Sequence, residues 1–254
     1  MPSSADESVQ TTTSVRWIEF AGCENFRDLG GLVTSTGVPV RYGQLYRSDT
    51  LDCLTDDDHL SFAALGIHTV IDLRAPSEIA KRGRIDLDRQ NVRYLNVPLV
   101  NTVGGSVRNP VEAARFEYPI LGYQQTLAEG PDRMAAVLRA LAEPEALPAV
   151  FHCFSGKDRT GLVAAVILRL LGVSESETAS EYALSQRRNR HSLASDEQKR
   201  MFPRIFGAPP DVIQAVLRGL EEVHDSIEGY VRSIGVEAEV VERLRVALLA
   251  RETG

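Results

Sequence analysis

A cysteine and an arginine, six residues apart, stand between two apolar runs in the middle of the chain, in VFHCFSGKDRTGLVAAVILRLLG (150–172). A short polar loop that runs into a helix can turn its backbone N–H groups inward and bind an anion. Gly156 permits the tight backbone that such a loop needs. Arg159 offers a planar fork that can hold two phosphate oxygens. The pattern therefore predicts a phosphate-binding loop with Cys153 at its base.

The same loop suits Cys153 as a nucleophile. Cysteines at helix N-termini or beside cations ionise with pKa values of roughly 3.5–7.5, so the groups that hold the phosphate also favour the thiolate. We expect Thr160 to hydrogen-bond the sulfur and ease its departure in a second step. The residues expected to bind substrate are Phe154, Ser155, Gly156, Lys157, Thr160 and Asp72.

A nucleotide-binding Walker A loop does not fit this stretch. That motif needs a glycine at position 151, where the chain has Phe151, and Ser or Thr after Lys157, where it has Asp158. The plainer alternative is a buried cysteine beside a surface arginine. Against it, His, Cys, Gly, Lys, Arg, Thr and Gly all suit one purpose within ten residues (152–161).

The composition of the whole chain limits the remaining possibilities. A net charge of −7 over 254 residues argues against non-specific nucleic-acid binding. Three scattered cysteines (Cys23, Cys53 and Cys153) predict neither a disulfide framework nor a zinc site. Without a long apolar run or an ordinary signal peptide, we expect no stable membrane insertion and a cytoplasmic location. Export without a conventional signal stays open, and residues 1–15 are expected to be a disordered tail.

Strands and helices must alternate around this loop if it is to sit at a sheet edge. Short β-branched or aromatic runs predict strands at 43–48, 68–74, 92–99 and 148–153. Helical patterns and caps predict helices at 55–66, 112–128, 131–142, 159–171, 174–188, 195–204, 210–234 and 237–250. This order is typical of an α/β domain with a mostly parallel sheet, here over residues 16–254. The helical part at 190–235 is a candidate lid over the site.

The loop HCFSGKDRTG (152–161) resembles the signature of the cysteine-dependent phosphatases, and more narrowly that of the bacterial atypical tyrosine phosphatases with Lys and Asp before the Arg. Supporting stretches are NFRDLGG (25–31), LYRSD (45–49), IDLR (71–74) and SEYALSQ (180–186). The resemblance implies a four- or five-stranded sheet with helices on both sides. It also implies hydrolysis through a phosphocysteine, without a metal or cofactor. The implied substrates are phosphotyrosine first, and then phosphoserine, phosphothreonine and phosphoinositides. Lys157 would be an extra cation in the loop and would favour substrates with several phosphates.

The general acid has three candidates. Asp158 lies inside the signature and is the position that the resembled family uses, so we favour it over a purely structural ion pair. Asp72 ends a strand expected beside that of Cys153, and orienting Arg159 or capping a turn suits it equally well. Asp132 follows Pro131 but stands where a helix cap belongs. Three further residues are weaker candidates for the rim and are more simply structural: Asn25, Arg47 and Arg74.

Two functions of other classes remain open from the sequence. One is a phosphate-binding adaptor that keeps the loop but turns over too slowly to matter, although a binder has no need of Cys153. The other is a rhodanese or an arsenate reductase with a similar anion loop. The expected partners are a phosphorylated protein or phosphoinositide substrate and a phosphate ion in the site. The oligomeric state is not predicted.

Overall fold

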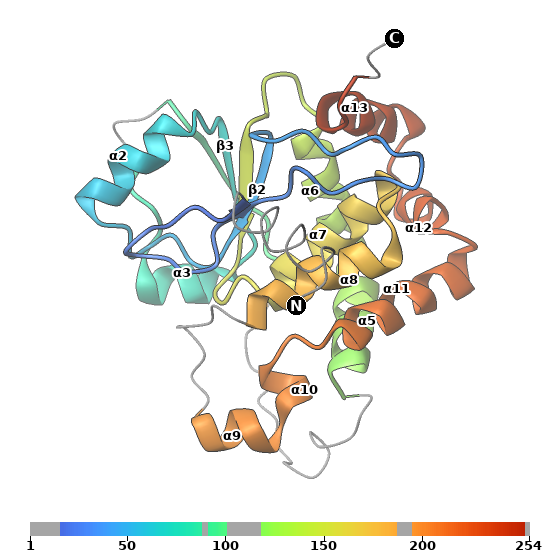
Figure 1. Cartoon of the computed structure of the whole chain (residues 1–254). Helices are drawn as coiled ribbons and strands as arrows, with labels where there is room; N and C mark the ends of the chain where they lie inside the picture. The colour runs from blue at the N-terminus through green and yellow to red at the C-terminus, as the bar shows by residue number, and fades with distance from the viewer. Residues whose placement is uncertain (1–15, 88–90, 101–117, 187–194, 252–254) are drawn as a thin grey trace, which may run out of the picture.

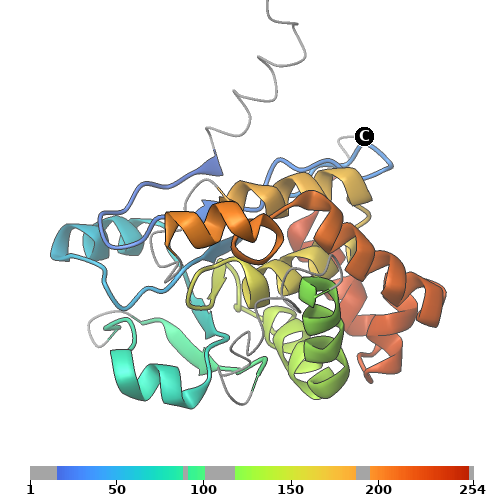
Figure 2. The same ribbon diagram turned by 90° about the horizontal axis from the view of Figure 1, so that it is seen from below.

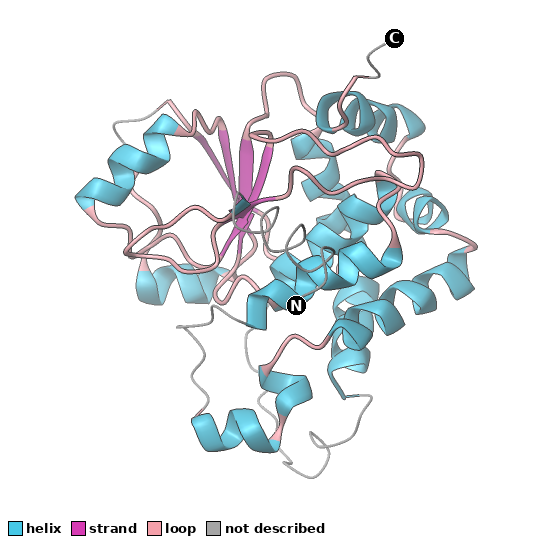
Figure 3. Ribbon diagram, in the orientation of Figure 1, coloured by secondary structure: helices cyan, strands magenta, loops and turns pink. Residues whose placement is uncertain are grey.

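A five-stranded sheet forms the centre of the protein. The computed structural model describes residues 16–87, 91–100, 118–186 and 195–251. The sheet order is β1-β2-β5-β3-β4, with β1 antiparallel and the other neighbours parallel (Figure 3). The strands are β1 (Arg27–Asp28), β2 (Leu45–Ser48), β3 (Thr69–Asp72), β4 (Arg93–Asn96) and β5 (Ala149–His152). The mostly parallel α/β fold predicted from the sequence is confirmed.

The register of the sheet brings three chain segments to one edge. His152 at the end of β5 lies opposite Ser48 of β2 and Asp72 of β3. Because parallel strands end at the same edge, residues 49, 73 and 153 leave the sheet together. Cys153 therefore emerges at the middle of the carboxyl edge, flanked on both sides.

Helices surround this sheet (Figure 1). Those before β5 are α2 (Asp56–Ala64), α3 (Pro76–Arg82), α5 (Tyr118–Glu129) and α6 (Pro131–Leu141). Those after it are α7 (Asp158–Leu170), α8 (Glu175–Ala183), α9 (Asp196–Met201), α10 (Pro203–Phe206), α11 (Pro210–His224), α12 (Ile227–Ser233) and α13 (Ala238–Leu248). Buried side chains cover nearly all of α7, as its apolar sequence predicted. Within the described residues, no helix is both long and apolar enough to cross a bilayer.

Three differences from the predicted elements have local causes. The helix expected over 195–204 is two helices, because Phe202 leaves the helical conformation (φ −130, ψ 61) before Pro203 starts α10. The long helix expected over 210–234 breaks at Asp225, which has φ 66, and Ser226 caps α12. Helix α3 was not predicted, although Pro76 at its first turn is a helix-start signal.

The candidate lid at 190–235 corresponds to two different kinds of structure. Helix α11 carries buried Val212, Ile213, Val216 and Leu217 and belongs to the main core. Helices α9 and α10 project beyond the body of the protein in Figure 1, and Figure 2 shows them from below, in front of the other helices. A lid therefore stays a prediction for α9 and α10, whereas α11 is a core helix. The tail predicted at 1–15 lies outside the described residues.

Candidate active site

The loop between β5 and α7 is held open by contacts to its outer side. The carbonyl of Phe154 accepts a hydrogen bond from the Thr50 N–H (3.1 Å). The carbonyl of Ser155 accepts from Asn25 Nδ2 (3.1 Å) and that of Gly156 from Arg47 Nη2 (2.6 Å). In a trans peptide the N–H points opposite to the C=O. The N–H groups of residues 155–157 are therefore directed to the inner side of the loop, where they can bind an anion.

Gly156 is required for the shape of this loop. Its φ is +66, and a Cβ at this position would lie 2.6 Å from the Asp49 backbone nitrogen and 2.7 Å from the Ser48 carbonyl oxygen. Any other residue would meet both strain and a backbone clash. The close approach is what allows Arg47 and Asn25 to reach the loop carbonyls.

Cys153 lies at the base of the loop and is 1% exposed. Two arginines interact with its sulfur electrostatically, Arg159 from α7 and Arg47 from β2. Burial acts to lower the pKa of Arg159, but the charges of Cys153 and Glu78 outweigh it, so the net pKa lies above the usual value. Burial lowers the pKa of Arg47, and the charges of Glu181 and Cys153 oppose that shift. The sulfur thus lies in the field of two cations.

Arg159 is oriented by Glu78 of α3. Arg159 Nη1 lies 2.5 Å from Glu78 Oε2, and Nη2 lies 2.9 Å from Oε1. Both side chains are only 13% and 12% exposed. Because this bidentate pair uses one edge of the guanidinium, the Nε–Nη2 edge keeps two donors for phosphate oxygens. Glu78 was missed in the sequence because its helix was missed.

Asp158 opens α7 with a partly exposed carboxylate, 44% accessible. Its Oδ1 accepts a hydrogen bond from the hydroxyl of Tyr123 and lies 3.2 Å from Lys157 Nζ. Thr160, in the first turn of the same helix, is fully buried, and its Oγ1 has no hydrogen-bond partner among the described residues. The structure therefore brings Cys153, Asp158, Arg159 and Thr160 together at one helix N-terminus.

Lys157 does not point where the sequence suggested. Its Nζ donates to the carbonyls of Ile205 (2.6 Å) and Gly207 (3.1 Å), and the residue is 5% exposed. Those carbonyls lie at the end of α10, so the ammonium is turned towards the helical segment rather than into the loop. Its expected role in substrate binding stays a prediction.

Asp72 is also engaged elsewhere. It is fully buried, and its oxygens accept from Arg74 (2.7 Å to Nη2), from the Arg74 N–H (2.9 Å) and from Tyr94 (2.8 Å). Burial acts to raise the pKa of Asp72, but its interactions with His152 and with the charged Arg74 hold it below the usual value. Burial keeps the pKa of His152 low in turn. The turn-capping alternative for Asp72 matches this geometry, and Glu78 takes the orienting role.

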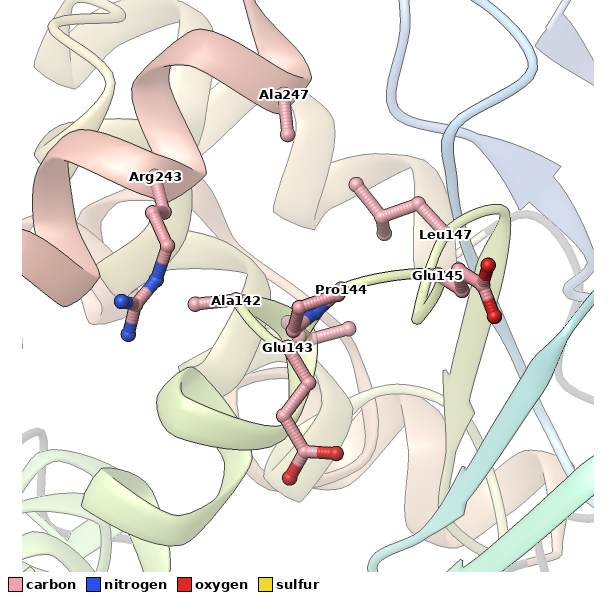
Figure 4. Close-up of a pocket in the computed structure, with 8 residues that line it drawn as sticks. Ala142, Glu143, Pro144, Glu145, Leu147, Arg243 and Ala247 are labelled. Carbon is pink, nitrogen blue, oxygen red and sulfur yellow. The ribbon is translucent and has the colours of Figure 1, made fainter.

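A shallow hollow elsewhere offers no comparable chemistry. It lies between the segment before β5 and α13, lined in part by Leu141, Glu143, Leu147 and Arg243 (Figure 4). That segment enters β5 at its amino end, so the hollow lies at the opposite edge of the sheet from Cys153. No cysteine lines it.

Comparison with known proteins agrees with this geometry. A model of the tyrosine phosphatase family matches residues 18–250. The chain belongs to the tyrosine phosphatase family. It is 28% identical over 278 aligned positions to the triple specificity protein phosphatase PtpB of Mycobacterium tuberculosis, covering 91% of this chain and 98% of that protein. It is also 28% identical to a tyrosine-protein phosphatase of Nostoc commune, covering 80% of this chain and 73% of that one.

Among solved structures, this tyrosine phosphatase family member resembles TpbA of P. aeruginosa at 20% identity and a TM-score of 0.40, covering 78% of this chain and 89% of that one. It resembles the catalytic core of the S. cerevisiae PP-IP phosphatase SIW14 at 18% identity and a TM-score of 0.39, covering 79% and 95%. Neither likeness is close enough to bear on the argument. The family resemblance inferred from the signature and flanking stretches is confirmed by the match over residues 18–250.

Proposed function

We propose that this tyrosine phosphatase family member hydrolyses phosphomonoesters through a phosphocysteine at Cys153. The observation that carries the proposal is the meeting of one buried sulfur, the Arg159 guanidinium and three inward N–H groups at the β5–α7 loop. A tetrahedral dianion suits that set of donors. Phosphotyrosine is the first substrate, because the family is that of the tyrosine phosphatases.

The reaction has two steps. In the first, Cys153 Sγ forms a bond to phosphorus as the bond to the leaving oxygen breaks, and the Asp158 carboxyl gives its proton to that oxygen. In the second, water attacks phosphorus and passes a proton to the Asp158 carboxylate. The S–P bond breaks, inorganic phosphate leaves, and Thr160 donates to the departing sulfur. Arg159 and the loop N–H groups stabilise the charge on the equatorial oxygens in both steps.

The proposed substrate range also includes phosphoserine, phosphothreonine and phosphoinositides. The PtpB relative is named for triple specificity. In this chain, two exposed arginines, one at the end of α3 and one two residues later, each stack on an aromatic ring. Arg82 lies 5.0 Å from the Phe154 ring centroid and Arg84 4.6 Å from that of Tyr94. Arg82 Nε donates to Asp52 Oδ2 (3.1 Å) and Nη2 to Cys53 Sγ (3.7 Å), so its Nη1–Nη2 edge keeps donors for a second phosphate.

The substrate range is tested by rates on phosphotyrosine, phosphoserine and phosphatidylinositol phosphates. We expect Arg82→Ala to lower the rate on a phosphatidylinositol bisphosphate more than the rate on phosphotyrosine. Lys157→Ala alongside tests the substrate-binding role expected for that residue. Equal losses of rate on all substrates in Arg82→Ala would show that Arg82 does not bind a second phosphate.

A measurement of turnover distinguishes a phosphatase from the alternative, a phosphate-binding adaptor. With p-nitrophenyl phosphate, the wild type should release p-nitrophenol and Cys153→Ser should not, while both bind inorganic phosphate. A wild type that binds phosphate without turnover would favour the adaptor. Thiosulfate or arsenate turnover alone would favour a rhodanese or an arsenate reductase. Because the proposed chemistry needs a free thiol, a reducing cytoplasm suits it, and cell fractionation tests that location.

A further inference from the structure

Two buried tyrosine hydroxyls form a chain that ends on Asp158. Tyr123 of α5 is 8% exposed and Tyr182 of α8 is 2% exposed. Their hydroxyl oxygens are 2.8 Å apart, and the Tyr123 hydroxyl donates to Asp158 Oδ1. Two helices far apart in the sequence thus meet at one carboxylate of the candidate site.

The direction of these hydrogen bonds follows from the number of protons. A phenol carries one O–H hydrogen. Tyr123 gives its hydrogen to Asp158 Oδ1, so the hydrogen between the two hydroxyls must come from Tyr182. Lys157 Nζ, 3.2 Å away, faces the same Oδ1. Because Oδ1 accepts from Tyr123 and faces the Lys157 ammonium, the proton of a neutral Asp158 is carried by Oδ2.

A glycine of the signature loop provides the space that the Tyr182 side chain occupies. A Cβ on Gly161 would lie 2.8 Å and 2.9 Å from two ring carbons of Tyr182. Glycine at this position therefore lets the Tyr182 ring pack against the first turn of α7. The Tyr182 and Tyr123 rings then meet edge to face, with centroids 6.4 Å apart. The two hydroxyls are fixed by packing rather than by the hydrogen bonds alone.

Both hydroxyls remain donors over the working pH range. Burial, followed by the charge of Asp158, raises the pKa of Tyr123 well above its ordinary value. The same two causes raise the pKa of Tyr182. A neutral phenol can donate but adds no charge, so the chain orients the carboxyl group without repelling an anionic substrate.

We propose that Tyr123, supported by Tyr182, is a positioning residue for the acid–base steps and holds Asp158 with Oδ2 directed to the leaving oxygen and then to water. The inference rests on the proposed role of Asp158. The groups that face this carboxylate are Tyr123 from α5, Tyr182 from α8, and Lys157 and Arg159 from its own segment. Asp211 of α11 acts on Tyr182 as well.

The test compares Tyr123→Phe in the wild-type and Asp158→Asn backgrounds on two substrates. Phenyl phosphate needs a proton on its leaving oxygen, whereas p-nitrophenolate leaves readily without one. We expect Tyr123→Phe to lower kcat about tenfold for phenyl phosphate and much less for p-nitrophenyl phosphate. In the Asp158→Asn background it should cause no further loss, since residues acting as a unit are not additive.

The pH profile gives a second readout that loss of packing would not move. Removing a donor from the carboxylate disfavours its ionised form, so the basic limb of the kcat profile should move to higher pH in Tyr123→Phe. Tyr182→Phe should give a smaller change in the same direction. Tyr230→Phe is the matched control, because that buried tyrosine of α12 has a hydroxyl with no partner among the described residues.

The outcomes separate this inference from the proposed function. If Asp158→Asn leaves both substrates unaffected, the acid assignment itself fails and the tyrosine inference fails with it. If Asp158→Asn is selective for phenyl phosphate but Tyr123→Phe lowers both substrates equally in both backgrounds, only the tyrosine inference is overturned. Thermal unfolding of each variant identifies any loss that comes from a misfolded protein.

Discussion

Glu78 illustrates how one residue outside the signature can control a residue within it. Its carboxylate holds both Nη atoms of Arg159 in a nearly buried bidentate pair. It also caps its own helix by accepting from the Ala75 N–H at 2.8 Å. The guanidinium edge that faces the loop is therefore set by α3. An arginine without this partner would keep its charge and lose its direction.

Replacing Glu78 by Gln should lower kcat/KM for p-nitrophenyl phosphate by about ten- to hundredfold, because a displaced clamp loses the transition-state geometry. Glu143→Gln is the control, since Glu143 pairs with Arg93 at the surface, where side chains are about half exposed, and surface pairs contribute little. Equal activity of the two variants would show that Arg159 needs no partner.

The shape of the loop between β5 and α7 depends on one glycine. Gly156 combines φ +66 with a Cβ position that overlaps the backbone after β2. Gly66, with φ +62, has nothing within 4 Å of its Cβ position. An alanine at either position would have a strained backbone, but only at Gly156 would its Cβ also clash with neighbouring atoms. The two substitutions therefore separate the effect of the clash from that of the strain.

Gly66→Ala should cost about 1 kcal/mol of unfolding free energy and leave activity intact. Gly156→Ala should cost more and abolish p-nitrophenyl phosphate hydrolysis, because the loop must move away from residues 48 and 49. Urea unfolding and steady-state rates measure both effects. A fully active Gly156→Ala would show that the loop shape does not depend on this contact.

Most elements could be predicted from local pattern, whereas the supports of the site could not. Apolar runs and caps identified the four parallel strands and α7, and the spacing from Cys153 to Arg159 identified the loop. The direction of a side chain depends on tertiary partners that no local pattern contains. Lys157 turns to the carbonyls of residues 205 and 207, and Asp72 turns to Arg74. Two-residue β1 is too short for a sequence signal.

At the scale of the whole molecule, one buried carboxylate joins the beginning of the described chain to the site. Glu181 of α8 pairs with Arg16, with Arg27 (2.8 Å) and with Arg47 (3.3 Å). Burial acts to raise the pKa of Glu181, but the three arginines lower it from 4.5 to about 2. Burial, with the neighbouring Arg47, lowers the pKa of Arg27 to about 9. Arg47 in turn holds the loop carbonyl of Gly156.

This network predicts a loss of stability in acid. A group whose pKa is lower in the folded state stabilises the fold above its unfolded pKa and loses that effect as the pH falls. For Glu181 the window runs from about 4.5 down to about 2, with a contribution of the order of 3 kcal/mol. The difference in unfolding free energy between wild type and Glu181→Gln should therefore be largest near neutral pH and shrink through this window. A difference independent of pH would contradict the assignment.

Rapid acid quench during turnover, followed by mass spectrometry of the digested protein, tests the central claim most directly. During hydrolysis of p-nitrophenyl phosphate, the peptide that contains Cys153 should carry one phosphoryl group, and the same peptide from Cys153→Ser should carry none. Full turnover with the phosphoryl group on another residue, or on no residue at any quench time, would contradict the account.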